Sequence, residues 1–301
     1  MEATLKQSDM SLGFIGLGVM GEPMCSNLVR KSNCRVYVND LESEPVQRIA
    51  AEGAVTCASI AEVAQAAEIV FLSLPSIVQV EQVCLGPNGL AGTQGKVRII
   101  VDMSTSDVTR TRKLAERLCE HGIVLIDAPV ARMRQAAKDG TLMITVGSTP
   151  AHFQEIAPYL SCMGTDVIHC GGIGNGQVVK IMNNMVVFMT VHALAEAITI
   201  GRSAGVDGTL LFNALSKGSA DSFVLRNPGQ KALASDNFPE RAFPTEYAIK
   251  DIMLALELAK EGKVDARAAK LTHSLLEQTR SAGFVKEYYP IMVRLIEKGY
   301  K

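Results

Sequence analysis

Short apolar runs alternate with segments of helical period through the first half of the chain. The runs are rich in β-branched residues and bounded by Gly, Asp, Pro or Ser; they read LGFIGLG, RVYVND, IVFLSLP, VRIIVDMS and IVLIDAPV, with TLMITVGS as a further candidate. The pattern between them predicts helices over 21–31, 44–52, 59–66 and 108–121. This alternation indicates a mainly parallel, doubly wound sheet with helices on both faces.

The pattern changes near residue 165. From residue 174 onward we find helical period and no convincing strand: one long helix from 177 to about 204, then helices near 207–217, 246–261 and 264–282. Gly, Pro and Asn punctuate KGSADSFVLRNPGQ and ASDNFPERAFPTE, which predicts loops there. We therefore predict an α/β domain over 1–165 and an all-α domain over 166–301.

Composition narrows the range of partners. Of the 301 residues 48% are hydrophobic and 20% charged, and the net charge of −1 comes without a basic block, so neither nucleic acid nor an anionic membrane is expected as a partner. No stretch approaches the roughly 18 uninterrupted apolar residues of a membrane span, and the segment MEATLKQSDM has no signal-peptide pattern. The seven cysteines form no CxxC pair and no cluster with His, which predicts reduced thiols, a cytoplasmic location and no metal site.

A glycine-rich turn follows the first apolar run and opens the first predicted helix. Its six residues are Gly16, Leu17, Gly18, Val19, Met20 and Gly21. In a strand–turn–helix context the GxGxxG spacing favours a Rossmann-type dinucleotide site, because it lets backbone approach a pyrophosphate at a helix N-terminus. A tight turn without a ligand is the alternative.

The second run ends in Asn39 and Asp40. Asp40 lies nineteen residues after Gly21, near the spacing expected for the acidic group that faces the adenosine ribose. A carboxylate there favours NAD over NADP, since it would repel a 2′-phosphate. The alternative is that Asn39 takes this position and Asp40 is solvated.

The stretch GGIGNGQVVKIMNNM precedes and opens the long helix. Lys180 and Asn184 are four residues apart and share a helix face, with Asn183 close by. A lysine and a carboxamide on a mostly apolar helix suit a partly buried polar site, where burial lowers the pKa of an ammonium group and allows proton transfer near neutral pH. A surface lysine beside a locally bonded asparagine pair is the alternative.

Taken together, the motifs resemble the β-hydroxyacid dehydrogenase family, which includes 3-hydroxyisobutyrate dehydrogenases, tartronate semialdehyde reductases and, more distantly, 6-phosphogluconate dehydrogenases. The resemblance covers residues from about 12 to 290 and is carried by four blocks in order: GFIGLGVMGEPMCSNLVRK; DMSTSDVTRTRKLAERL with DAPVARMRQAAKDGTL; GNGQVVKIMNN; and AIKDIMLALELA. It implies a Rossmann-type domain, a long interdomain helix and a helical domain that commonly forms a homodimer or homotetramer.

The resemblance also implies roles for single residues. Lys180 matches the catalytic lysine at the substrate oxygen and Asn184 its hydrogen-bonding partner. The other matched positions are Ser104 and Thr105, which contact substrate and nicotinamide, Leu74 and Pro75 near the nicotinamide ribose, and Lys250, which closes on the cofactor. Asp251 either belongs with Lys250 or is only a carboxylate near a helix start.

Two departures from the family pattern stand out. After DAPV the family usually has Ser-Gly-Gly, which holds the substrate carboxylate, whereas this chain has Ala131, Arg132 and Met133. Sulfolactaldehyde reductases look most similar here, with Gly-Arg-Thr, so Arg132 is predicted to bind an anionic head group of the substrate. Arg134 is expected on a solvated helix face with Lys138. Second, Val108 stands near a position where proline is common.

These observations predict an oxidoreductase that transfers a hydride between NAD(P) and a short 3-hydroxy acid, its semialdehyde or a sulfonate analogue such as sulfolactaldehyde. The alternative is a non-catalytic NAD(P)-binding scaffold or sensor. The presence of Lys180, Asn184 and Ser104 argues against that alternative, and the lysine argues against an imine reductase.

Overall fold

The computed structural model describes residues 10–240 and 242–299. The chain forms two compact units, the first ending at Lys180 and the second beginning at Ile181. The boundary between residues 165 and 166 that the sequence suggests stays a prediction.

The first unit is built on a parallel six-stranded sheet. Its strands are β1 (Ser11–Ile15), β2 (Arg35–Asn39), β3 (Val55–Thr56), β4 (Ile69–Leu72), β5 (Ile99–Asp102) and β6 (Val124–Asp127). The order β3-β2-β1-β4-β5-β6 reverses direction between β1 and β4, as in a dinucleotide-binding sheet. The predicted Rossmann-type fold is confirmed.

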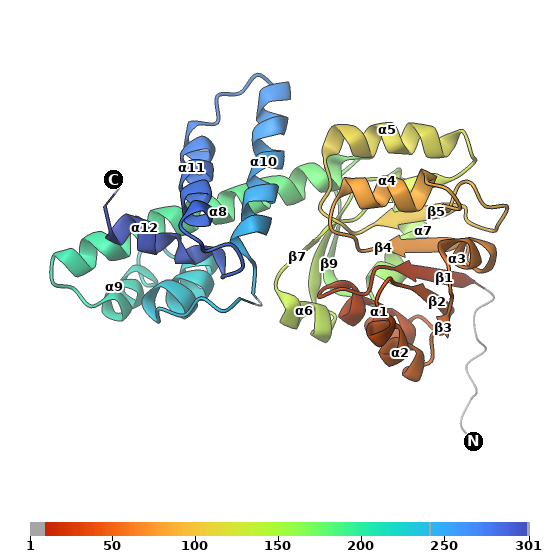
Figure 1. The fold of residues 1–301 in the computed structure, drawn as a ribbon, viewed down its shortest axis with the longest axis horizontal. Coiled ribbons are helices and arrows are strands. Elements are labelled where there is room, and N and C mark those ends of the chain that lie inside the picture. The colour runs from red at the N-terminus through yellow and green to blue at the C-terminus, as the bar shows by residue number, and fades with distance from the viewer. Residues whose placement is uncertain (1–9, 241, 300–301) are drawn as a thin grey trace. The chain divides into compact units, whose positions relative to one another are not determined.

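Helices cover both faces of this sheet, because strands such as β4 and β5 are apolar and buried on both sides. Phe71 packs with Leu28 in one core, whereas Val70 packs with Val80 and Leu114 in the other. Figure 1 shows α4 and α5 along one face and α1 and α2 along the other. The helices of this unit are α1 (Gly21–Lys31), α2 (Ser43–Ala51), α3 (Ile60–Ala66), α4 (Ile77–Leu85), α5 (Val108–Cys119), α6 (Arg134–Asp139) and α7 (Pro150–Leu160).

A second, smaller sheet follows β6. It contains β7 (Val130–Ala131), β8 (Leu142–Val146) and β9 (Gly164–His169), with β7 antiparallel and β9 parallel to β8. The candidate TLMITVGS is therefore a strand, but it lies outside the large sheet. The sequence analysis missed β9 and the short β3, because neither is a continuous apolar run.

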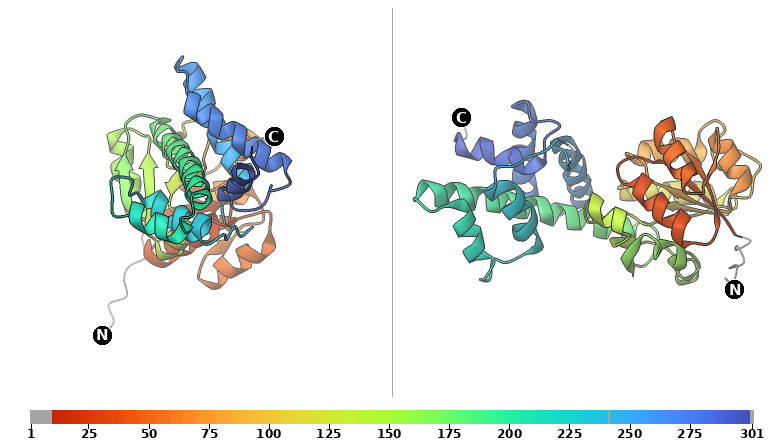
Figure 2. Two further views of the ribbon diagram at one scale, coloured as in Figure 1. Left: turned by 90° about the vertical axis from the view of Figure 1, so that its left-hand side faces the viewer. Right: turned by 90° about the horizontal axis from the view of Figure 1, so that it is seen from below.

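The second unit is helical. It contains most of α8 (Asn175–Ser203), then α9 (Gly208–Leu215), the π-helix η1 (Leu225–Ala234), α10 (Thr245–Glu261), α11 (Arg267–Ser281), the 3₁₀ turn η2 (Tyr289–Met292) and α12 (Val293–Glu297). The helices of this unit pack against one another (Figure 2). Buried in their common core are Phe188, Phe212, Leu233, Ile252 and Leu276. No described residue after 174 belongs to a strand, as predicted.

The prediction of a loop over KGSADSFVLRNPGQ is wrong in its second part. Residues from Leu225 onward form η1 although Pro228 and Gly229 lie within it. Both the proline and the glycine are buried there, together with Leu225 and Leu233, so tertiary packing overrides the local turn preference.

By length and composition alone, α8 is apolar enough to cross a bilayer. The core helix of a soluble protein meets the same criterion. Phe188, Val191 and Ile198 of α8 are buried in the core of the second unit, which is the packing expected of such a core helix.

Candidate active site

The glycine turn between β1 and α1 has the geometry that a dinucleotide requires. Gly16 has φ +96°, and a Cβ there would come 2.3 Å from the carbonyl oxygen of Ser73. A Cβ on Gly21 would lie 1.9 Å from the carbonyl oxygen of Gly16. Gly18, in contrast, is exposed, and a Cβ there would meet nothing within 4 Å. The outer glycines thus allow tight packing, and the middle one leaves room for phosphate at the start of α1.

The carboxylate of Asp40 lies against this turn. It accepts a hydrogen bond from the backbone N–H of Leu17 and another, at 2.8 Å, from that of Glu42. The side-chain amide of Asn39 donates instead to the carbonyl oxygen of Cys57 at 2.9 Å. Of the two candidates at the end of β2, Asp40 is therefore the one whose side chain contacts the glycine turn.

A cavity of about 320 Å³ adjoins Asp40 beyond the ends of β2 and β3. Its lining residues are Asn39, Asp40, Leu41, Ser43, Val46, Gln47, Thr56, Cys57 and Ala58. Among these described residues there is no Lys or Arg that could pair with a 2′-phosphate. The cavity fits the adenosine half of a dinucleotide whose phosphates lie at the glycine turn.

The loop after β5 is held by a buried polar network. The backbone N–H of Leu74 donates to the hydroxyl of Ser104 at 2.9 Å, which joins two of the predicted site loops. The Gln177 amide donates to the carbonyl oxygen of Ser104 at 2.7 Å and accepts from the N–H of Ser106 at 3.0 Å. Asp102 accepts from the N–H of Ser104 at 2.9 Å and from the Ser106 hydroxyl at 3.0 Å. Gln177 therefore connects the Ser104 loop to the first turn of α8.

Lys180 lies one turn after Gln177 on α8 and is only 9% exposed. The first turn of this helix binds a second buried group, Asp127 at the end of β6. The Asp127 carboxylate accepts from the N–H groups of Gly174 at 2.7 Å and of Gln177 at 2.8 Å. Burial raises the pKa of Asp127 to about 6, against the lowering effect of these two hydrogen bonds.

The sequence analysis did not single out Asp127, Asp102 or Gln177. The position of each of the three in the sequence could have identified it. The two aspartates end apolar parallel strands, where ligands of doubly wound sheets bind. Gln177 precedes Lys180 by three residues and so shares its helix face.

Within the second unit, Asn184 belongs to another buried cluster. Its side-chain nitrogen donates to Asp251 at 2.7 Å, and its oxygen accepts from Asn183 at 3.1 Å. The Lys250 ammonium lies 3.0 Å from the other oxygen of Asp251. Asp251 is buried inside α10, so the alternative of a mere helix-start carboxylate is wrong.

Arg132 has internal partners. Its guanidinium donates to the carbonyl oxygen of Thr141 at 2.5 Å and lies 2.6 Å from the Asp166 carboxylate, whose pKa it lowers. The backbone of Arg132 is left-handed, with φ +85°, which explains why a glycine suits this position. Ala131 is buried in β7, and a substrate-binding role for either residue stays a prediction.

The remaining sequence predictions in this region concern helix positions. Arg134 and Lys138 are both exposed on α6, as expected of a solvated face. Val108 is the first residue of α5, whose N-cap is Asp107. The absent proline therefore falls at a helix start.

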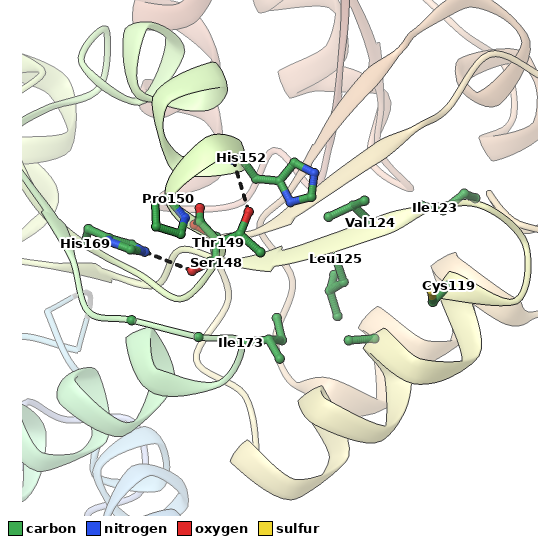
Figure 3. Close-up of a pocket in the computed structure, with 13 residues that line it drawn as sticks. Cys119, Ile123, Val124, Leu125, Ser148, Thr149, Pro150, His152, His169 and Ile173 are labelled. Carbon is green, nitrogen blue, oxygen red and sulfur yellow. Dashed lines mark hydrogen bonds between the residues drawn. The ribbon is translucent and has the colours of Figure 1, made fainter.

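A separate cavity of about 580 Å³ opens between α5, β6 and the start of α7 (Figure 3). Leu125, Ile173 and Cys119 are among its lining residues, and His169 bonds to the Ser148 carbonyl oxygen at its rim. None of the predicted site residues lines it. This cavity is therefore distinct from the dinucleotide site.

Comparisons with known proteins agree with this geometry. Residues 11–172 match the model of the NAD-binding domain of 6-phosphogluconate dehydrogenase, and residues 174–296 match that of the NAD-binding domain of NADP-dependent 3-hydroxyisobutyrate dehydrogenase. The chain is 35% identical to 2-(hydroxymethyl)glutarate dehydrogenase of Eubacterium barkeri, over 97% of this chain and 96% of that one. It is 34% identical to 2-hydroxy-3-oxopropionate reductase of Escherichia coli K12, over 83% and 85% of the two chains.

A solved structure extends the similarity to three dimensions. The 3-hydroxyisobutyrate dehydrogenase of Mycobacterium tuberculosis, solved with L-serine, superimposes with a TM-score of 0.85 at 25% identity, over 95% of this chain and 99% of that one. The fold, the glycine turn and both family models thus indicate the same family. The chain belongs to the β-hydroxyacid dehydrogenase family of NAD(P)-dependent oxidoreductases.

Proposed function

We propose that this protein interconverts a short 3-hydroxy acid and its semialdehyde, with Lys180 as the proton donor or acceptor at the substrate oxygen. The names of the relatives support this substrate class. 2-(Hydroxymethyl)glutarate, 2-hydroxy-3-oxopropionate and 3-hydroxyisobutyrate each place an alcohol or aldehyde carbon β to a carboxylate. The observation that supports the proposal most is the burial of Lys180 one helical turn after Gln177, whose side chain bonds to Ser104.

The residues of the chain have complementary tasks in this scheme. The nicotinamide, when bound, supplies or accepts the hydride. Lys180, whose side chain is buried, holds the proton that the substrate oxygen gains or loses. Asn184, four residues along the same helix, orients the substrate, and Ser104 and Thr105 contact both reactants.

The coenzyme that we propose is NAD. The Asp40 carboxylate at the glycine turn supports this preference, as does the absence of Lys and Arg from the described lining of the adjoining cavity. A 2′-phosphate in that cavity would meet a negative charge without a cation to offset it.

The deciding experiment is an initial-rate panel with NADH and NADPH against sulfolactaldehyde, succinic, tartronate and methylmalonate semialdehydes, and glyoxylate. We expect turnover of a carboxylate semialdehyde with NADH. Lys180→Ala should lower kcat about 10²- to 10⁴-fold, whereas the control Lys138→Ala, on the exposed face of α6, should not change it. If NADH binds and nothing turns over, the chain is a dinucleotide-binding scaffold or sensor instead.

We further propose a cytoplasmic homodimer or homotetramer. The seven cysteines are free, which suits a reducing compartment. Val186, Ala193 and Ile200 are exposed at intervals of seven residues on α8 and so share one helix face in the second unit. An exposed apolar face of this kind supports association through the helical unit.

A further inference from the structure

Asp127 is a fully buried carboxylate at the start of α8. Its side chain is 0% exposed. A Cβ on Gly147 would come 2.1 Å from one carboxylate oxygen, and a Cβ on Gly176 would come 2.8 Å from the other. Backbone thus packs directly against the carboxylate from two sides, which only glycines permit.

The start of α8 needs an acceptor of this kind. The first N–H groups of a helix have no partner within the helix, and a side-chain oxygen at the N-cap usually satisfies one of them. Here the first helical hydrogen bond runs from Val178 to Gly174, and a glycine has no side chain with which to cap. Asp127, forty-seven residues earlier in the chain, supplies both oxygens instead, to Gly174 and Gln177.

The charged and titratable groups around Asp127 do not replace this interaction. Asp102 adds negative charge and further raises the pKa of Asp127. Negative charge on Asp127 contributes in turn to raising the pKa of the Cys170 thiol. The Arg112 guanidinium donates at the same turn to the carbonyl oxygen of Ile173 and to the side chain of Asn175. The carboxylate of Asp127 accepts from the N–H groups of Gly174 and Gln177, and its own backbone N–H also lowers its pKa.

The consequence of this interaction extends to Lys180. Gln177 is bonded through its backbone to Asp127 and through its side chain to the Ser104 loop. Lys180 follows Gln177 by one helical turn, so a displacement of the first turn moves the Lys180 side chain relative to Ser104. Displacements of about 1 Å can cost about 10²-fold in rate.

We infer that Asp127 is a positioning residue, which fixes the first turn of α8 on the large sheet and thereby sets the position of Lys180 relative to the Ser104 loop. The inference rests on the proposed function, in which Lys180 transfers the proton. Asp127, at the end of β6, thus affects catalysis without contacting the reactants.

A double-mutant cycle on the full-length protein tests this inference. Asp127→Asn keeps the size of the side chain but turns one acceptor into a donor that faces an N–H group. With NADH and the best aldehyde of the panel, we expect Asp127→Asn to lower kcat about 10- to 100-fold and to leave the Kd of NADH within about 2-fold. In the Lys180→Ala background the same change should lower kcat less than about 2-fold, because the group that it positions is gone.

Two controls keep the outcome unambiguous. Asp207→Asn removes the carboxylate that caps α9 by accepting from Leu210 at 2.9 Å and should leave kcat unchanged. If Asp127→Asn does not fold, Gly176→Ala takes its place in the cycle, because the added Cβ presses on the same turn while the carboxylate remains.

The outcomes separate the two hypotheses. If Asp127→Asn lowers kcat by the same factor with and without Lys180, Asp127 acts independently of the lysine and the inference is overturned, while the proposed function stands. An unchanged kcat in the Asp127→Asn single variant also overturns the inference alone. If Lys180→Ala itself leaves kcat unchanged, both the proposed function and the inference fail.

Discussion

The Asp127 carboxylate is buried, so its ionisation costs free energy of desolvation. Burial raises its pKa from the ordinary 3.8 to about 6, so between these pH values the folded chain holds a proton that the unfolded chain has lost. This group's contribution to the free energy of unfolding is therefore largest below about pH 4 and falls as the pH rises to about 6. A shift of this size corresponds to about 3 kcal/mol.

The prediction at this residue compares the free energy of unfolding of the wild type with that of Asp127→Asn. Asp127→Asn cannot ionise, so the free energy of unfolding of wild type minus that of the variant should fall from pH 4 to 6 and level off above. Urea unfolding followed by circular dichroism at steps of pH measures both, and the other carboxylates cancel in the difference. Parallel pH curves for the two proteins would show that Asp127 does not titrate in this range.

Arg132 combines backbone strain with an exposed ion pair. A non-glycine residue in the left-handed region costs about 1–2 kcal/mol, and the pair with Asp166 lies in solvent. Arg132→Gly relieves the strain while Arg132→Ala keeps it, so we expect the glycine variant to be the more stable of the two by about 1 kcal/mol. Thermal unfolding of both variants tests this.

The same two variants decide whether Arg132 binds substrate. If it holds an anionic head group, KM should rise at least about tenfold in both variants, since a charge-assisted contact of this kind contributes more than about 1.4 kcal/mol. An unchanged KM for the best substrate leaves Arg132 with its contacts to Asp166 and Thr141 alone.

At the scale of elements, the β1–α1 turn contains two glycines that differ in the space around them. Gly18 borders open space, whereas Gly21 packs against the Gly16 carbonyl. We expect Gly18→Val to weaken NADH binding at least about tenfold (about 1.4 kcal/mol) without lowering Tm, because the side chain enters the space left for phosphate. Gly21→Ala should lower Tm, because its Cβ meets backbone.

Calorimetric titration with NADH and thermal unfolding of both glycine variants provide the measurements. Comparing Gly18→Val with Gly21→Ala distinguishes a variant that blocks the cofactor site from one that disturbs the packing of the turn. Unaltered NADH affinity in Gly18→Val would place the pyrophosphate elsewhere.

At the scale of the whole molecule, the proposed oligomer is the feature to test. A carboxylate on the Val186, Ala193 and Ile200 face would be desolvated on association, so Val186→Glu with Ile200→Glu should shift the protein towards monomer. Sedimentation velocity measures the mass, and Val78→Glu, at an exposed apolar position on α4, serves as control. A double variant with the mass of the wild type would move the interface away from this face.

The sequence by itself determined the class of the fold and most of its helices and strands. Continuous apolar runs such as IVFL have no polar face, so they had to be buried on both sides between helices, and α1 has the predicted bounds, 21–31. The glycine turn was also predictable, because its spacing reflects a local steric requirement that the structure meets at Gly16 and Gly21. Where local preference and packing disagreed, as at Pro228 in η1, the sequence pattern was misleading.

Tertiary structure alone decided which side chains meet. Asp127 and Gly174 are far apart in the chain, as are Leu74 and Ser104, and no periodicity encodes their hydrogen bonds. The sequence left open whether Asn39 or Asp40 faces the glycine turn, and it could not reveal that Arg132 pairs with Asp166. Periodic patterns record whether a residue faces a core, whereas a hydrogen bond between distant residues depends on strand order and register, which form only when the whole sheet assembles.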